Sequence, residues 1–252
     1  DFQVNDRLAA VAQKTGDRSA ELVALRKGLA ITEDRIKAES AVADWRQRSA
    51  VVLRRLGRHH GGEGASEEAE TYYRQSIAIA RELVGDSAIP SSTSRRELMI
   101  SLAQFGDYAL GQGKPEMAIA AYQESVSLLE ELAGAPSTRS PALKHDVSIG
   151  YQRMADAYIA AKNGKEALAW ATRDIEISQA LLARDERAPS LQRDLGSSYD
   201  RMGQALALLG RNSDSIAAYS NGVKSFEAAI ASDDTQTNWQ RDAATILANM
   251  GK

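Results

Sequence analysis

One phrase recurs along this chain at a nearly constant interval, and this repetition limits the possible folds more than any local motif does. The segment LQRDLGSSYDRMG begins at Leu191, and the related segment WQRDAATILANMG begins at Trp239. Aligning the related segments places a small residue at the same position of every copy, at Gly57, Gly106, Ala155, Gly203 and Gly251, with a period of 48 to 49. Periods of about 20 to 50 residues are typical of solenoids and other repeat architectures. We therefore expect a stack of similar units.

Two further positions recur in the same register. A second small residue lies 12 positions after the first, at Ala69, Ala118, Ala167 and Ser215. Four positions further on, the chain has Tyr73, Tyr122, Ala171 and Tyr219. The same spacing predicts a weaker copy at the N-terminus, with Leu8, Ala20 and Ala24 in the matching positions.

The spacing of apolar residues within a unit is helical. Tyr199, Met202 and Leu206 share one stripe, and Ile216 and Tyr219 begin another, as expected for two amphipathic helices. A glycine or alanine on one helix would admit the ring of Tyr73, Tyr122 or Tyr219 from the other, because closely packed helices need small residues where they touch. The predicted units are 1–44, 45–93, 94–142, 143–190, 191–238 and a partial unit 239–252.

This pattern resembles the tetratricopeptide repeat family. The resemblance rests on the apolar residue before the small one, the small residue itself, the Ala or Ser 12 positions later and the aromatic residue after that. It implies an all-α fold, a right-handed α-solenoid of stacked antiparallel helix pairs. The family period is about 34 residues, so a period of 48 to 49 predicts that both helices of each unit are longer.

The last unit stops at MGK, before a second helix could follow, and the first helix of the N-terminal unit is short. We expect the chain to be a fragment of a longer protein. The alternative is that the last helix is a solvating cap, which solenoids require.

Composition excludes several classes of function. A formal charge of −3 gives no electrostatic footprint for nucleic acid, and no apolar run is long enough to span a membrane. The balance of apolar and charged residues predicts a soluble protein, with the cytoplasm as the expected location. There is no cysteine, so thiolate chemistry and Cys-based metal sites are excluded.

The sequence also nominates no catalytic group, metal or cofactor. His59, His60 and Glu63 form the one cluster to weigh as a metal site, but adjacent helical side chains diverge by about 100°. We interpret this segment as a helix end followed by a glycine turn. The third histidine, His145, is expected at the surface.

The resemblance implies that the first helix of each unit lines a concave, partner-binding surface. Transferred to this chain, the lining residues are Arg54, Arg58, Asp107, Gln152, Asp156, Asp200 and Gln204. Arg54 and Arg58, with other arginines nearby, would bind an acidic segment of a partner, and the aspartates would attract basic residues. The alternative is that these charges pair between neighbouring helices, for example Arg58 with Asp107.

The leading functional hypothesis is a non-catalytic scaffold or regulatory module that binds a protein or peptide, or another domain of its own parent chain. Similar arrays are often attached to signalling or effector domains of bacterial proteins, so an intramolecular sensor arm is one alternative. Self-assembly through exposed helices is another, since an uncovered apolar face is costly.

Overall fold

The computed structural model describes residues 1–38, 42–86, 91–134, 140–185, 188–232 and 237–251. These residues form eleven helices and no strand, which confirms the predicted all-α class. The helices are α1 (Phe2–Thr15), α2 (Arg18–Lys37), α3 (Val42–Gly62), α4 (Ser66–Val84), α5 (Ser91–Gly111), α6 (Pro115–Gly134), α7 (Pro141–Ala160), α8 (Gly164–Leu182), α9 (Pro189–Leu208), α10 (Asn212–Ser232) and α11 (Thr237–Met250).

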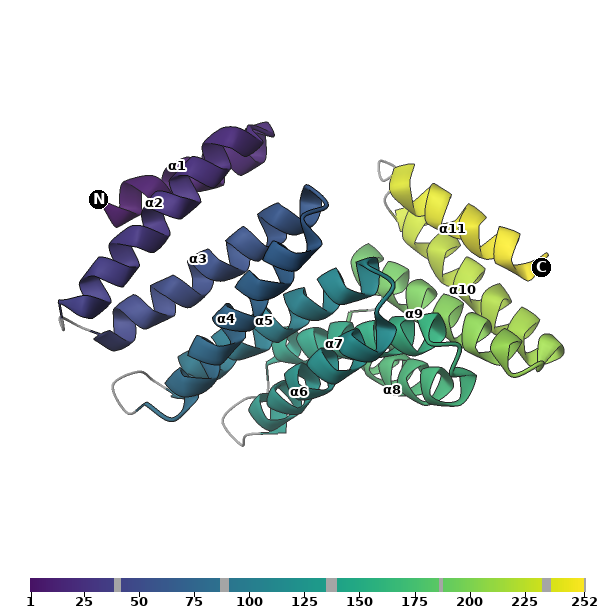
Figure 1. The fold of residues 1–252 in the computed structure, drawn as a ribbon. Helices are drawn as coiled ribbons and strands as arrows, with labels where there is room; N and C mark the ends of the chain where they lie inside the picture. Colours follow the sequence, from purple (N-terminus) through teal and green to yellow (C-terminus); the bar gives the residue numbers. More distant parts are fainter. Residues whose placement is uncertain (39–41, 87–90, 135–139, 186–187, 233–236, 252) are drawn as a thin grey trace. The chain divides into compact units, whose positions relative to one another are not determined.

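The helices form two compact units, Asp1–Gly111 with α1 to α5 and Gln112–Lys252 with α6 to α11. Within each unit every helix packs against the next one in the chain, and successive helices run antiparallel (Figure 1). The odd-numbered helices are the first helices of their pairs, and the even-numbered ones are the second helices. The predicted stacking of antiparallel helix pairs is therefore confirmed.

Contacts between alternate helices distinguish the two layers of each unit. The first helices α3 and α5 touch in unit 1, and α7–α9 and α9–α11 touch in unit 2. Among the described residues, no second helix touches the next second helix within a unit. These first helices thus lie closer together than the second helices do, so they lie on the inner side of their unit, whereas α1 and α3 make no such contact in the described residues.

The prediction of long helices is also correct. Helices α2 to α10 contain 19 to 21 residues each. Pro115, Pro141 and Pro189 are the first residues of α6, α7 and α9, where the missing N–H costs no hydrogen bond. Pro90 and Pro136 lie outside the described residues.

The recurring glycines act as predicted. A Cβ added at Gly57 of α3 would lie 2.9 Å from the ring of Tyr73 on α4. At Gly203 of α9, a Cβ would overlap the ring of Tyr219 on α10. Hydrogen in place of a side chain lets the two helices of a pair approach, and the ring fills the space between them.

The register of the N-terminal copy differs by one position from the predicted one. The Asp17 N–H donates to the Ala12 carbonyl, and in the next repeat the Ala65 N–H donates to the His60 carbonyl. Ala9, Glu21 and Leu25 are accordingly buried, whereas Leu8 and Ala20 are exposed. The prediction placed the N-terminal copy 49 residues before the next copy. The equivalent hydrogen bonds in the two turns show that the distance along the chain is 48 residues.

The histidine-containing segment ends a helix, as expected. Helix α3 ends at Gly62, and Gly64 has a φ of 75° in the following turn. His59 is buried, with Nδ1 3.0 Å from Oε2 of Glu21, whereas Glu63 pairs with Arg18. Within the described segments, no three His, Cys, Asp or Glu side chains are arranged to hold a metal ion, and no helix is long and apolar enough to cross a bilayer.

Candidate partner-binding surface

Three of the seven residues predicted to bind a partner lie in unit 1. Arg54 of α3 is only 12% exposed and contacts Glu97 of α5, with Nη2 3.4 Å from Oε2. Burial lowers the pKa of Arg54 below its ordinary value, although Glu97 opposes this. Asp107 is exposed on α5. Arg54 therefore already bridges the two neighbouring first helices.

Arg58 is the more accessible arginine of the predicted basic end. Its side chain is 41% exposed, and its Nη2 donates to Oε1 of Gln13 at 2.9 Å and lies 4.0 Å from Oε1 of Glu21. Arg58 thus faces the preceding helix pair, with part of its side chain open to solvent. The other arginines nearby are also engaged, Arg55 with Asp6, Arg46 with Glu82, and Arg48 over the rings of Phe2 and Trp45.

The remaining four predicted residues, Gln152, Asp156, Asp200 and Gln204, lie in unit 2 in one polar network. Arg201 of α9 forms a two-pronged ion pair with Asp156 of α7, at 2.7 Å from Nε to Oδ1 and 3.0 Å from Nη2 to Oδ2. Burial lowers the pKa of Arg201, but the carboxylates around it, chiefly that of Asp156, outweigh this and raise it above its ordinary value. The guanidinium stays charged and ties two first helices together.

Asp200 continues the network to the next first helix. Gln204 Nε2 donates to its Oδ2 at 2.9 Å, and Asn249 Nδ2 of α11 donates to its Oδ1 at 3.3 Å. Burial raises the pKa of Asp200, and the two amide hydrogen bonds oppose this. The inner layer of unit 2 is therefore linked from α7 to α9 to α11 by side-chain contacts.

Gln152 joins this network from its buried side. Its amide lies 3.4 Å from both the Ser148 hydroxyl and Asp174 Oδ1, and Ser148 also bonds to Asp174 and to Ser178. Asp174 is fully buried on α8, and its Oδ2 has no hydrogen-bond partner among the described residues. Burial raises the pKa of Asp174, although its hydrogen bonds oppose the change.

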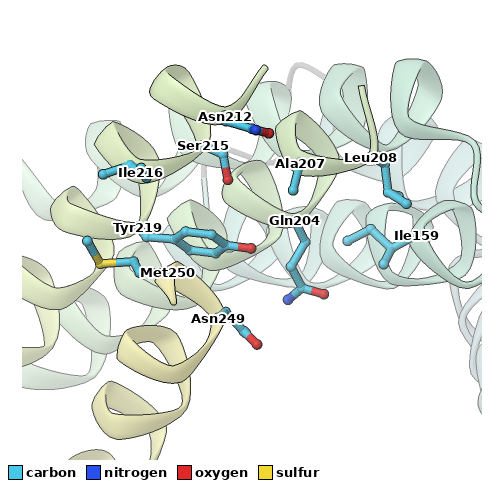
Figure 2. A pocket seen from close by; sticks show the side chains of 10 residues that line it. All are labelled: Ile159, Gln204, Ala207, Leu208, Asn212, Ser215, Ile216, Tyr219, Asn249 and Met250. Atoms are coloured by element: carbon cyan, nitrogen blue, oxygen red, sulfur yellow. The ribbon is translucent and has the colours of Figure 1, made fainter. Parts of the chain in front are cut away.

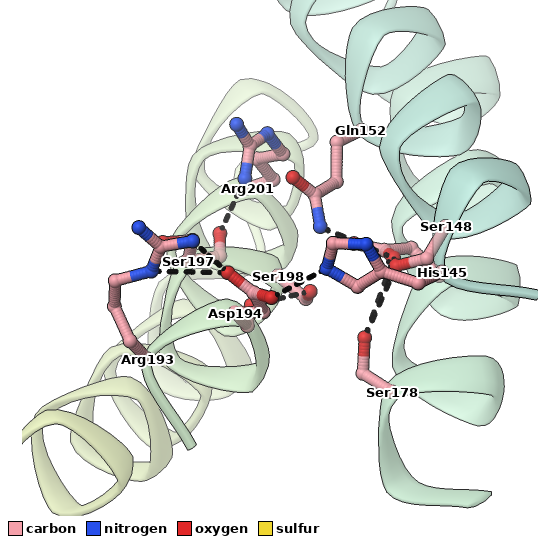
Figure 3. Close-up of polar contacts among 10 residues, drawn as sticks. His145, Ser148, Gln152, Ser178, Arg193, Asp194, Ser197, Ser198 and Arg201 are labelled. Atoms are coloured by element: carbon pink, nitrogen blue, oxygen red, sulfur yellow. Dashed lines mark hydrogen bonds and ion pairs between the residues drawn. The ribbon is translucent and has the colours of Figure 1, made fainter. Parts of the chain in front are cut away.

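A second contact between α7 and α9 involves His145, which was expected only to be at the surface. Its side chain is partly exposed, and its Nε2 lies 2.9 Å from Oδ2 of Asp194. Arg193 bonds to the other oxygen of the same carboxylate. Figure 3 shows His145 and Arg193 converging on Asp194 beside the serines and Gln152.

An open recess of about 550 Å³ lies beside the network in unit 2. Figure 2 shows the amides of Gln204 and Asn249 on one side and the ring of Tyr219 beside them. Leu208 and Ile216 line the recess and are 43% and 48% exposed. Exposed apolar side chains around a few polar groups are typical of sites that bind a partner.

Several of these residues were missing from the sequence-based set. Arg201 lies one position after the predicted Asp200, and Asn249 is the equivalent of Arg201 in the last repeat. Leu208 ends α9, and Ile216, expected on the packed stripe of α10, is instead half exposed. The predicted lining residues were chosen at the spacing i, i+3, i+7, which places them on a single face of each helix. This spacing cannot show which side chains reach across from a neighbouring face.

The comparisons with known proteins agree with this architecture. Residues 42–87 match the family model described as the tetratricopeptide repeat. A variant of the nearly identical TPR-like repeats of a Podosopora anserina putative kinesin light chain superposes with a TM-score of 0.66, at 15% identity, covering 93% of this chain and 97% of that one. For BtubC (BKLC) from P. vanneervenii the TM-score is 0.58, at 19% identity, with 98% and 80% coverage.

A search of curated proteins gives no match. The structural likenesses are at low identity and show the fold. Together with the matched family model they confirm the predicted resemblance to tetratricopeptide repeats. Repeats of this type commonly mediate protein–protein interactions, and scaffolds built from them are generally not catalytic.

Proposed function

We propose that this chain, built of tetratricopeptide-type repeats, is a protein-binding module that holds a segment of a partner against the first helices of unit 2. The single observation that carries the proposal is the open recess lined by Leu208 and Ile216 beside the network of Asp156, Arg201 and Asp200. The recess offers apolar contact area, and the network offers charge and amide groups.

The preceding helix pair indicates what fits the recess. Gly164 begins α8 as Asn212 begins α10 in the next repeat. A Cβ added at Gly164 would lie 3.0 Å from Leu208 Cβ and 3.0 Å from Leu209 Cγ, so the end of α9 fills that place with leucines. Leu208 and Ile216 line the recess at the start of α10. Leucine-like side chains of a partner match this lining in polarity.

The charge of this surface favours a basic residue next to those apolar side chains. Asp156, Asp174 and Asp200 all lie near the single guanidinium of Arg201. Because part of the Asp156 side chain is exposed, a lysine or arginine of the partner gains attraction at the edge of the recess. The expected ligand is thus a segment that combines leucine-like and basic residues.

A displayed library of random peptides, selected on the folded chain, tests this function. The proposal predicts enriched peptides with an apolar residue near Lys or Arg, whose binding is lost in Leu208→Arg and Ile216→Arg. Val23→Arg is the matched control, because Val23 is equally exposed but lies on α2 in unit 1. Peptides that bind all three variants equally would refute the site.

One observation favours self-association as a second function. Val4, Leu8 and Val11 form an apolar stripe on α1 and are 53 to 59% exposed. We infer that a second copy of the chain covers the stripe. Light scattering across a dilution series would then show dimers that Leu8→Glu dissociates, whereas a monomer at every concentration would exclude this function.

Three more specific features of the proposed function remain predictions. Arg54 and Arg58 remain the proposed contact for an acidic segment of a partner, with Arg58 the accessible member. Attachment to a signalling or effector domain of the same parent protein would make the module an intramolecular sensor arm. The cytoplasm remains the expected location.

A further inference from the structure

A second recess lies on the outer side of unit 2, away from the surface described above. It encloses about 440 Å³ between the C-terminal parts of α6 and α8, with α7 beneath. Its lining comprises Glu130, Ala133, Gly134, Lys144, Val147, Tyr151, Glu176, Ile177 and Ala180. Helices α6 and α8 do not touch each other in the described part of the chain, so the recess occupies the space between two second helices.

The next repeat has the same framework at the equivalent positions. Tyr151 OH of α7 donates to Oε1 of Glu130 on α6 at 2.6 Å. Tyr199 OH of α9 accepts from Nε2 of Gln179 on α8 at 3.0 Å. Because each tyrosine binds the same position of the preceding second helix, the two sites can be compared residue by residue.

The first difference between the two sites is their size. Ala133 and Val147 line the recess, whereas the equivalent residues are Leu182 and Leu195. Gly134 corresponds to Ala183. Each replacement adds at least one carbon, and two of them add a bulkier apolar side chain. The walls are smaller than in the next repeat at these three positions, whereas Ile177 is larger than its equivalent, Ser225.

The second difference is charge. Glu130 and Glu176 occupy positions where the next repeat has Gln179 and Lys224. Lys144, where the next repeat has Gln192, is the only basic residue among the lining side chains. Among the described residues, no side chain pairs with Glu176. Two carboxylates against one ammonium leave this recess acidic, and the equivalent site lacks both carboxylates.

We propose that this outer recess binds a lysine side chain of a partner protein, with the aliphatic stem against Val147 and Ile177 and the ammonium group at Glu176 and Glu130. The proposal is independent of the inner surface.

Tyr151 keeps Glu130 in position. Burial, reinforced by the hydrogen bond to Glu130, raises the pKa of Tyr151 to about 12. The phenol therefore stays protonated at neutral pH and orients the carboxylate. Lysine buries its stem on apolar surface while its ammonium reaches polar groups. The recess offers the same order of groups, because Val147 is buried and the carboxylates of Glu130 and Glu176 are exposed.

Methyl NMR titration of the whole chain with N-acetyl-lysine N-methylamide tests this inference. The matched probe is the norleucine derivative, which has the same stem without the ammonium. The lysine probe should shift the methyl signals of Ala133, Val147 and Ile177 in a saturable way. The norleucine probe should bind about fivefold more weakly or worse, since it lacks the charge interaction.

The variants use residues that the next repeat already has at these positions, so the fold should accept them. Ala133→Leu should abolish the shifts by filling the recess, and Glu176→Lys should weaken binding about fivefold or more. Lys224→Glu is the control and should leave binding unchanged. The proposal is overturned if wild type shows no saturable shift, if both probes bind equally, or if Ala133→Leu binds as wild type does.

Discussion

Gly203 on α9 lies so close to Tyr219 on α10 that a Cβ at position 203 would overlap the aromatic ring. The same relationship joins Gly57 to Tyr73 in unit 1, where the Cβ would lie 2.9 Å from the ring. In both pairs the glycine is on a first helix, and the tyrosine is at the same position of the second helix that follows it. Close approach at this point holds these two helix pairs together.

Gly57→Ala should therefore destabilise the protein. Replacing a helical glycine by alanine ordinarily stabilises a helix by up to about 1 kcal/mol. Here the added methyl must displace a buried ring, which typically costs about 1–3 kcal/mol. We expect the free energy of unfolding, measured with urea, to fall by about 1–2 kcal/mol. Gly111→Ala is the control, because a Cβ at Gly111 meets nothing within 4 Å, and a similar loss there would contradict the role of the ring.

Arg201→Leu should destabilise the second unit by about 2–4 kcal/mol, since it leaves the carboxylates near it without their cation. The control is Arg211→Leu, which removes an exposed pair with Asp214 worth about 0–1 kcal/mol. Urea unfolding followed by circular dichroism gives both values. Equal effects of the two substitutions would show that the Asp156–Arg201 contact is not important for stability.

Asp174 should make stability depend on pH. Because burial raises its pKa in the folded state, the folded chain keeps this proton over a range in which the unfolded chain has lost it. Stability from this group is present below the unfolded value of about 3.9 and is lost as pH rises through the folded pKa. Asp174→Asn should remove this part of the pH dependence. Urea unfolding of both proteins from pH 4 upward would contradict the account if their stability difference stayed constant.

Arg58→Glu should weaken binding of acidic peptides without unfolding the chain. The side chain is partly exposed, and its contact with Gln13 is on the surface. The new carboxylate would also lie near buried Glu21, so the structural cost should be about 1–3 kcal/mol. Fluorescence anisotropy with a labelled glutamate-rich peptide measures the binding, and Arg211→Glu provides a control of equal charge change. Unchanged affinity in the folded Arg58→Glu variant would remove this residue from the acidic-segment hypothesis.

The fold could be predicted from features that are visible in the sequence itself. The regular repeat period, glycines opposite tyrosines and helical apolar stripes are local and repeated, so each copy reinforces the others. The candidate surface was only partly predictable. Gln152, Asp156, Asp200 and Gln204 do lie in one network, but its cation, Arg201, is one position beyond the lining positions that were inferred.

Contacts between helices explain why the rest of the candidate surface could not be predicted from the sequence. Arg54 was expected to face a partner, and its side chain also reaches Glu97 on the next first helix. His145 reaches Asp194 in the same way. Such reach depends on the distance between neighbouring helices and on side-chain rotamers, neither of which a repeat spacing specifies. The N-terminal register was misplaced for a related reason, since the length of one turn decides between a spacing of 48 and one of 49.

Hydrogen–deuterium exchange of the whole chain, with and without a peptide selected on it, tests the central claim most directly. If the inner surface of unit 2 binds the partner, exchange should slow in the C-terminal turns of α9 and α11 and the first turns of α10. Slower exchange confined to other helices, or none at saturating peptide, would contradict the claim.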